Sequence, residues 1–106
     1  GSDAPVESAN PFWGLHAAVT RQRPNGVPGP DGWHPEQRLS LSDALAAYTL
    51  NPARACGLGN SYGKIAPGNP ADLIVLPRDP FSIHPSELWQ IQPDMTLIDG
   101  QIVFQR

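Results

Sequence analysis

The chain has 106 residues, a formal net charge of −3 and a hydrophobic content of 40%. Its length suits one modest domain. Its acidic balance argues against the basic surface that nucleic acids and anionic membranes attract, so we expect neither as a partner. Basic residues are dispersed, and only Arg21 and Arg23 lie close together. No apolar run reaches the roughly 18 residues of a membrane-spanning helix, and we expect a cytoplasmic protein.

The first predicted element is a helix over residues 12–20. It is preceded by Asn10-Pro11, which places a capping side chain before a proline at the first helical position. Apolar residues follow at helical spacing and predict one buried stripe, formed by Phe12, Leu15, Ala18 and Val19. The helix should end before Pro24, because proline disfavours helical backbone in the residue that precedes it.

Residues 24–38 form a loop rich in proline and glycine. Loops of this length inside a compact domain are usually functional or disordered. Trp33 and His34 near its end favour anchoring or ligand contact over disorder. The alternative for this pair is a packed indole beside an exposed imidazole.

A second helical region follows the loop. Ser40 and Asp43 have the spacing of a capping box, with aspartate in place of the commoner glutamate. Asn51-Pro52 restarts a short helix that Gly57 or Gly59 should end. Cys56 has no partner for a disulfide, and we expect it to be a small buried hydrophobe.

The last part of the chain is predicted to form strands. Residues 72–76 are a short apolar run, and residues 95–98 and 101–104 flank Asp99-Gly100, a strong hairpin signal. Between them we expect a connecting loop with a helical turn near residues 86–89. These strands have exposed edges unless others complete the sheet. The remaining strands should come from another part of the parent protein or from a second copy.

Five segments in the same order resemble the C-terminal part of the amidohydrolase superfamily. The most specific is residues 63–76, GKIAPGNPADLIVL. Residues 1–6 are similar to the end of the last barrel strand in that superfamily. Residues 32–38 resemble the G-W-x-P-x-Q-R stretch of its family-3 branch, the YtcJ-like and AepA-like metal-dependent hydrolases. Residues 44–57 and 96–103 also resemble segments of the superfamily that occur in the same order.

This resemblance implies an α+β fragment of a larger enzyme. Residues 1–59 would supply the end of barrel strand 8 with the following helices and loop of a (β/α)8 barrel. Residues 60–106 would supply the C-terminal strands of a small composite β-sandwich. The parent would use a divalent metal, expected to be zinc, to activate water against carbon–nitrogen bonds other than peptide bonds in a small-molecule substrate. The isolated chain is expected to be inactive and to hold no metal.

Asp3 is the candidate catalytic residue and metal ligand. A carboxylate at the C-terminal end of a barrel strand faces the catalytic site. In the superfamily, the matching aspartate binds a metal and handles the proton of the attacking water. Without that context, an aspartate here would be interpreted as a cap or a solvated charge. Trp33 and Arg38, in the loop that resembles the family-3 branch, are the candidate substrate-binding residues.

The histidines do not extend this metal site. His16, His34 and His84 are too far apart for the paired spacings of metal ligands. Further ligands would have to come from upstream of this chain. His16, on a helix, is expected either to pack structurally or to be exposed, and His84 is expected to be solvated.

Two other classes of function are left open. One is a regulatory or binding module similar to exoenzyme regulatory proteins, for which the acidic composition gives no DNA-binding support. The other is a structural domain that self-associates as a homo-oligomer. The sequence does not identify the substrate, because specificity depends on a site rather than on a fold.

Overall fold

We describe residues 2–106 of a computed structural model; Gly1, with which the N-terminal motif and the first predicted domain begin, lies outside the described residues. The fold is α+β. In chain order the elements are α1 (Pro11–Thr20), η1 (Pro35–Gln37), α2 (Leu41–Tyr48), α3 (Leu50–Ala55), β1 (Leu73–Val75), η2 (Pro85–Gln90), β2 (Met95–Ile98) and β3 (Gln101–Gln105). Two compact units contain them: one joins the chain up to Leu45 with Arg78–Ile91, and the other joins Ala46–Pro77 with Gln92–Arg106.

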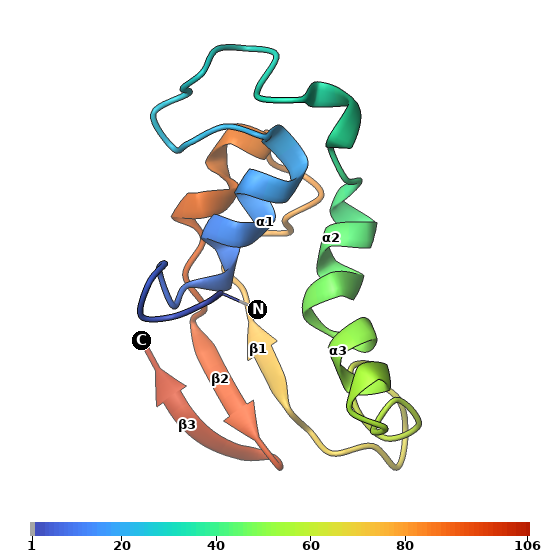
Figure 1. The fold of residues 1–106 in the computed structure, drawn as a ribbon. Coiled ribbons are helices and arrows are strands. Elements are labelled where there is room, and N and C mark those ends of the chain that lie inside the picture. Colours follow the sequence, from blue (N-terminus) through green and yellow to red (C-terminus); the bar gives the residue numbers. More distant parts are fainter. Residues whose placement is uncertain (1) are drawn as a thin grey trace. The chain divides into compact units, whose positions relative to one another are not determined.

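Helix α1 is the main element of the first unit (Figure 1). Asn10 caps it as predicted, because its side-chain oxygen accepts a hydrogen bond from the backbone N–H of Phe12 at 3.0 Å. The predicted stripe is only half right. Phe12 and Leu15 are buried, but the stripe continues through His16 and Thr20 rather than through Ala18 and Val19.

The core of the first unit lies where α1 packs against the 3-10 helix η2. The helical turn predicted near residues 86–89 is this helix. Leu88 and Ile91 are almost completely buried, and Trp13 meets Trp89 edge to face with ring centroids 6.1 Å apart. His84 begins η2 and is exposed, as predicted, and its ring nitrogen accepts from the backbone N–H of Ser86.

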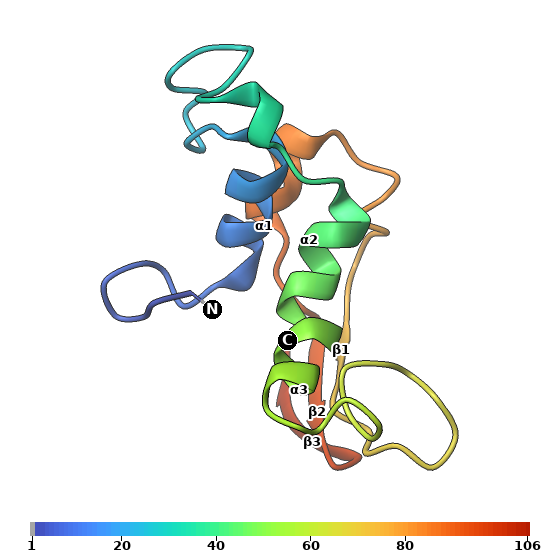
Figure 2. The ribbon, with the colours of Figure 1, turned by 45° about the vertical axis from the view of Figure 1, so that its right-hand side comes forward.

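The capping box predicts the start of α2 correctly. The hydroxyl of Ser40 accepts from the backbone N–H of Asp43 at 3.1 Å and donates to its carboxylate at 2.7 Å. Helix α3 follows after one residue, and Figure 2 shows the two helices in succession. Cys56 ends α3 and is exposed, so the prediction that it is buried was wrong. It ends a short helix and is followed by a turn, where no other element covers it.

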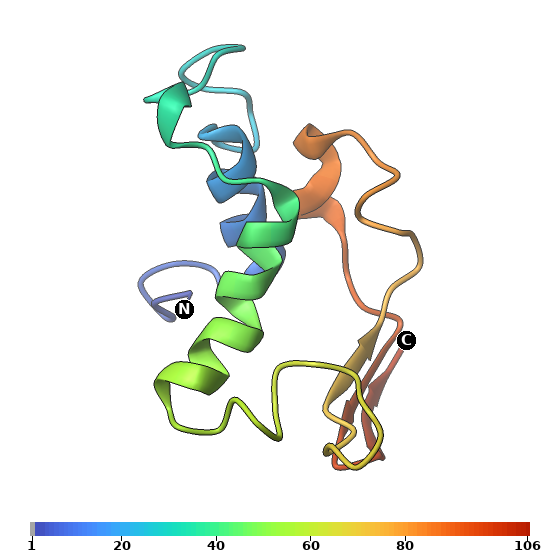
Figure 3. The same ribbon diagram turned by 90° about the vertical axis from the view of Figure 1, so that its right-hand side faces the viewer.

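The second unit contains a three-stranded antiparallel sheet in the order β1-β2-β3, drawn yellow to red in Figure 3. The predicted hairpin is present: both turn residues, Asp99 and Gly100, have positive φ, as a two-residue type I′ turn requires. The register shifts between Thr96 and Leu97, where Val103 is the extra residue on β3.

Strand β1 is shorter than predicted and lies at an edge of the sheet. Its apolar run predicts burial on both faces, yet Ile74 and Val75 are about half exposed. The loop before it approaches α3 closely at Gly63. A Cβ there would lie 2.7 Å from the Cα of Leu50. Glycine is therefore required at this position of the 63–76 motif by close packing as well as by the positive φ of the turn.

The second unit has no core of its own within residues 2–106. Every residue in the described chain that is fully buried belongs to the first unit. The three apolar residues of β3 are all exposed: Ile102, Val103 and Phe104. Ile102 and Phe104 pair with the consecutive residues Leu97 and Thr96 of β2, so they lie on opposite faces of the sheet. Both faces of this edge strand are therefore available for packing. Separately, none of the helices between residues 2 and 106 has the length and apolar character needed to cross a bilayer.

Candidate functional site

Asp3 lies in the turn that leads into the N-terminal end of α1. Its φ of 55° is left-handed, a conformation that aspartate tolerates better than most residues. Its backbone oxygen accepts from the N–H groups of Val6 at 2.9 Å and Glu7 at 3.2 Å. The side chain is exposed, and its carboxylate has no hydrogen-bond or ion-pair partner among residues 2–106. The carboxylate is thus available for a ligand.

The predicted loop, at the other end of α1, is ordered by three consecutive β-turns. The N–H of Gly26 donates to Arg23, that of Gly29 to Gly26, and that of Gly32 to Gly29, at 2.8 to 2.9 Å. Each turn has a proline at one of its two central positions and ends on a glycine, residue types that β-turns favour. The loop therefore has a defined path despite its composition, in agreement with the expectation of anchoring.

The loop returns to the C-terminal end of α1, where helix carbonyls lack helical partners (Figure 2). The N–H of Leu39 donates to the oxygen of Ala18 at 3.0 Å. Gly32 passes so close that a Cβ there would lie 2.3 Å from the oxygen of Thr20. With a φ of 72° as well, this position is suited only to glycine.

Arg21 and Trp33 join the two ends of this loop through three interactions. The N–H of Trp33 donates to the oxygen of Arg21, and the Nε–H of Arg21 donates to the oxygen of Trp33, both at 2.9 Å. The guanidinium carbon of Arg21 lies 5.1 Å from the centre of the indole, within cation–π range. The pair therefore holds both the loop and the orientation of the Arg21 side chain.

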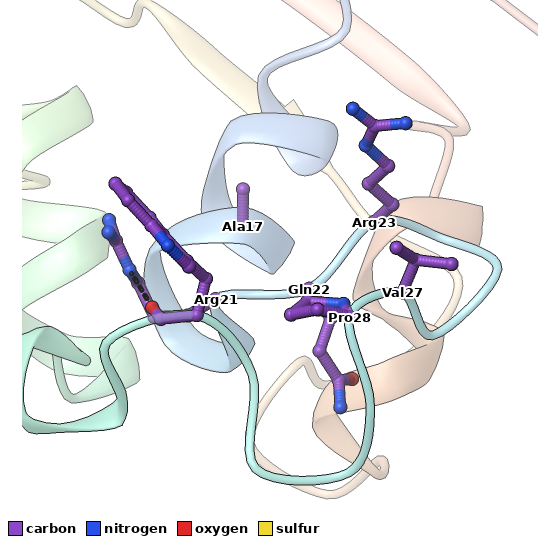
Figure 4. A pocket seen from close by; sticks show the side chains of 7 residues that line it. Ala17, Arg21, Gln22, Arg23, Val27 and Pro28 are labelled. Carbon is purple, nitrogen blue, oxygen red and sulfur yellow. Dashed lines mark hydrogen bonds between the residues drawn. The ribbon is translucent and has the colours of Figure 1, made fainter.

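A hollow of about 470 Å³ opens beside this pair (Figure 4). Ala17 of α1 lies on one side, and Val27 and Pro28 of the loop lie on the other, which makes these walls apolar. The polar groups that line the hollow are the side chains of Arg21, Gln22 and Arg23 and the indole of Trp33. No aspartate or glutamate lines it. We call this cavity the α1 hollow.

His34 and Glu36 lie next to the α1 hollow and form an exposed pair. Nδ1 of His34 is 2.9 Å from the carboxylate of Glu36. The pKa of Glu36 is lowered, first by a hydrogen bond from its own backbone N–H and then by one from the His34 ring. The positive charge of Arg21 lowers it slightly further, so this carboxylate is the acidic group that lies in the field of the hollow.

The structure does not bring the three predicted site residues together. Trp33 lines the α1 hollow. Arg38 does not line it; its guanidinium donates to the backbone oxygen of Asp31 and closes the loop. Asp3 lies at the opposite end of α1, a helix of 10 residues that spans about 15 Å. One small substrate cannot contact Asp3 and Trp33 together.

The described residues do not form a metal site by themselves. No group of three or more His, Cys, Asp or Glu side chains in residues 2–106 could hold a metal ion. A stable zinc site has either four protein ligands or three protein ligands and a water molecule. Asp3 offers only one carboxylate. His16 does not contribute, because its ring is buried in the core of the first unit and belongs to no such group.

Sequence reasoning identified Trp33 among the residues that line the α1 hollow and missed the other six: Ala17, Arg21, Gln22, Arg23, Val27 and Pro28. The closeness of Arg21 and Arg23 in the sequence was a signal, since it predicts two positive charges in one region. What the sequence did not show is that three successive turns bring residue 27 and residue 33 back beside α1.

Comparison with known proteins identifies the family. The model of the amidohydrolase family matches residues 1–104. "Putative amidohydrolase YtcJ" of Bacillus subtilis (strain 168) is 38% identical over 106 residues, which are all of this chain and 20% of that protein. "N-substituted formamide deformylase" of Arthrobacter pascens is 35% identical over 105 residues, 99% of this chain and 19% of that protein.

A more distant relative is "Imidazolonepropionase" of Kosmotoga olearia, 28% identical over 95 residues, which are 90% of this chain and 20% of that protein. The chain thus spans about a fifth of the length of these relatives. No solved structure gives a significant match. The family match over nearly the whole chain confirms the predicted resemblance: the chain belongs to the amidohydrolase family.

Proposed function

We propose that this chain is the C-terminal part of a longer hydrolase that cleaves carbon–nitrogen bonds, other than peptide bonds, in small molecules. The observation that carries the proposal is the match of the whole chain to relatives about five times as long, one of them named as a formamide deformylase. A cytoplasmic location is part of the same proposal.

We assign the catalytic carboxylate to Asp3. In hydrolysis of an amide-type bond, the oxygen of water bonds to the carbonyl carbon, the carbon–nitrogen bond breaks, and a proton moves from water to the leaving nitrogen. Asp3 would accept that proton and return it to the nitrogen. Its exposed carboxylate, free of partners among residues 2–106, supports this role.

The amidohydrolase family is generally metal-dependent, and we propose a divalent metal, zinc, in the whole protein. Of the residues described here, Asp3 would be one ligand, and the others would come from outside this chain. When bound, such a metal lowers the pKa of its water ligand toward neutrality. We derive no step through the metal, because the present residues do not complete its site.

The architecture of the whole protein is a proposal as well. Residues 1–59 would supply the end of strand 8 of a (β/α)8 barrel with the helices and loop that follow it, and residues 60–106 would supply the C-terminal strands of a small β-sandwich. The exposed apolar side chains of β3 support the second part, because such a strand is usually covered by further strands or by another layer. The N-terminal part of the protein is the proposed cover. A second copy of the chain, which would make the domain self-associate, is the alternative.

Substrate binding by Trp33 and Arg38 stays a prediction. Because α1 separates them from Asp3, they could contact only a part of the substrate about 15 Å from the bond that is cut. Arg38 is engaged within the loop, so an effect of its substitution on KM would act through the position of Trp33.

The experiment that tests the proposed function is hydrolysis of a series of N-substituted formamides by the natural-length protein, with and without a chelator. We expect release of the amine that is lost on chelation and restored by zinc. Absence of hydrolysis across formamides, ring amides and anilides by a metal-loaded protein would contradict the proposal. Activity that is unaffected by complete removal of metal would contradict its metal dependence.

A further inference from the structure

The α1 hollow has the size and the lining of a binding site for a small organic molecule. Its volume of about 470 Å³ lies within the roughly 300–1,000 Å³ of small-molecule pockets. Ala17, Val27 and Pro28 supply aliphatic surface, and Trp33 supplies an aromatic one that is 62% exposed. Most of the lining thus suits an apolar body, with a few polar groups at defined places (Figure 4).

The charge of the hollow selects the polar part of its ligand. Two arginines, Arg21 and Arg23, are among its lining residues, in a chain whose net charge is −3. Their guanidinium groups point to different sides (Figure 4): that of Arg21 lies against the indole of Trp33, and that of Arg23 has no partner within residues 2–106. Guanidinium groups bind carboxylates through strong charge-assisted hydrogen bonds.

The hollow is also organised before any ligand binds. Arg21 is held by Trp33 through its Nε–H and by stacking. The backbone N–H of Arg23 donates to the oxygen of Val27 at 2.8 Å, and the side chain of Gln22 donates to that of Gly29 at 2.6 Å. Groups that are already fixed lose little entropy on binding.

We propose that the α1 hollow binds an organic carboxylate with an apolar body, the carboxylate at Arg23 and the apolar body against Val27, Pro28 and the indole. Asp3 is at the other end of α1, so this site is separate from the proposed reaction centre. The carboxylate has two potential sources: the far end of a long substrate, or a separate organic acid that binds alongside it.

The test is titration of the natural-length protein with benzoate, benzamide and inorganic phosphate, observed through the indole side-chain NMR signals and by calorimetry. Benzoate should bind saturably and shift the signal of Trp33, and added salt should weaken it. Benzamide has the same ring without the charge, and phosphate has the charge without the ring. Each should bind at least tenfold more weakly than benzoate, a difference of about 1.4 kcal/mol.

Two variants and a control locate the site. Arg23→Gln should weaken benzoate about tenfold by removal of one charged hydrogen-bond donor, and Trp33→Leu should weaken it by a similar factor. Arg78→Gln, which changes an exposed arginine that does not line the hollow, should leave binding unchanged. Both variants alter exposed side chains, and unchanged circular dichroism would show that the fold is intact.

Equal binding of benzamide and benzoate, or an unchanged affinity in Arg23→Gln, would overturn the proposal. If phosphate bound as tightly as benzoate, the proposal that the hollow binds the apolar body of its ligand would be overturned. Inhibition of hydrolysis then distinguishes the two sources: benzoate competes with a substrate whose far end occupies the hollow, whereas it does not compete with the substrate if the natural occupant is a separate acid. The binding measurement needs no turnover, so it stands whether or not the proposed hydrolysis is found.

Discussion

Oδ1 of Asp72 accepts a hydrogen bond from the backbone N–H of Asp99 at 2.8 Å, although the two residues lie 27 positions apart. The neighbouring N–H of Gly100 donates to the oxygen of Ala71 at 3.1 Å. The residues just before β1 are thus tied to the turn between β2 and β3. Asp72 thus has a structural role, and its partner lies across the sheet rather than in the local backbone that aspartate often binds.

Asp72→Ala should therefore loosen the hairpin turn. Loss of the acceptor leaves the N–H of Asp99 without its partner, at a cost of about 1 kcal/mol. Hydrogen exchange of that amide should become faster, while exchange in α1 stays the same. Asp72→Asn keeps an oxygen acceptor and is the matched control. Equal protection of the amide in the wild type and in Asp72→Ala would show that the bond does not stabilise the turn.

His16 should make the stability of the first unit depend on pH. Burial of its ring disfavours the charged form and lowers its pKa from the ordinary value of 6.5, and Nδ1 has no hydrogen-bond partner among residues 2–106. Below pH 6.5 the unfolded chain therefore binds more protons at His16 than the folded chain does. As far as His16 is concerned, the free energy of unfolding is highest above pH 6.5 and falls as the pH decreases toward the lowered pKa of the folded state.

Urea unfolding on either side of pH 6.5, monitored by tryptophan fluorescence, measures this effect. His16→Leu should remove most of the pH dependence, because leucine fills the site without titrating. His34→Gln, at an exposed histidine, should retain it. If the slope of stability against pH were the same in His16→Leu as in the wild type, the dependence would arise elsewhere.

Gly32→Ala should open the loop at the C-terminal end of α1. The added Cβ would meet the oxygen of Thr20 at 2.3 Å, and the positive φ adds strain of about 1 kcal/mol or more. Gly26→Ala is the control, since its φ is also positive but nothing lies within 4 Å of the new Cβ. Thermal unfolding should show a lower Tm for Gly32→Ala than for Gly26→Ala, and equal values would mean that the close approach has no energetic weight.

The sheet of the second unit should associate when nothing covers it. Ile102, Val103 and Phe104 are between 48% and 56% exposed on an edge strand. Light scattering of the 106-residue chain over a wide concentration range should show oligomers or aggregates. Phe104→Lys should shift it toward monomer, whereas Phe81→Lys, the same substitution at an exposed phenylalanine of the first unit, should not. A monomeric wild-type chain with one sharp cooperative melt would contradict this prediction.

Local signals in the sequence predicted the elements well, because their causes are local. The Asn10 cap, the box of Ser40 and Asp43, and the Asp99-Gly100 turn each act within a few residues. Burial was predicted less well. Cys56 is exposed and His16 is buried, since burial depends on which distant segment covers a side chain, and the strand pattern does not say that β1 lies at an edge.

The candidate site shows the same division. Asp3 was found through a motif rather than through its surroundings, and its role stays a prediction. The α1 hollow depends on three turns that bring Arg23 and Trp33 to one helix end, a path that no periodicity in the sequence indicates. Residues 32–38 were correctly singled out, yet Trp33 and Arg38 take different places in the loop.

The measurement that tests the account most directly is the turnover of Asp3→Asn in the natural-length protein, with an N-substituted formamide as substrate and with metal content determined in parallel. Asn keeps the shape of the side chain but cannot accept the proton of water, so kcat should fall by about 10²–10⁴-fold. Asp31→Asn, an exposed aspartate at the other end of α1, should retain activity. Near-normal turnover of Asp3→Asn with unchanged metal content would remove Asp3 from the mechanism.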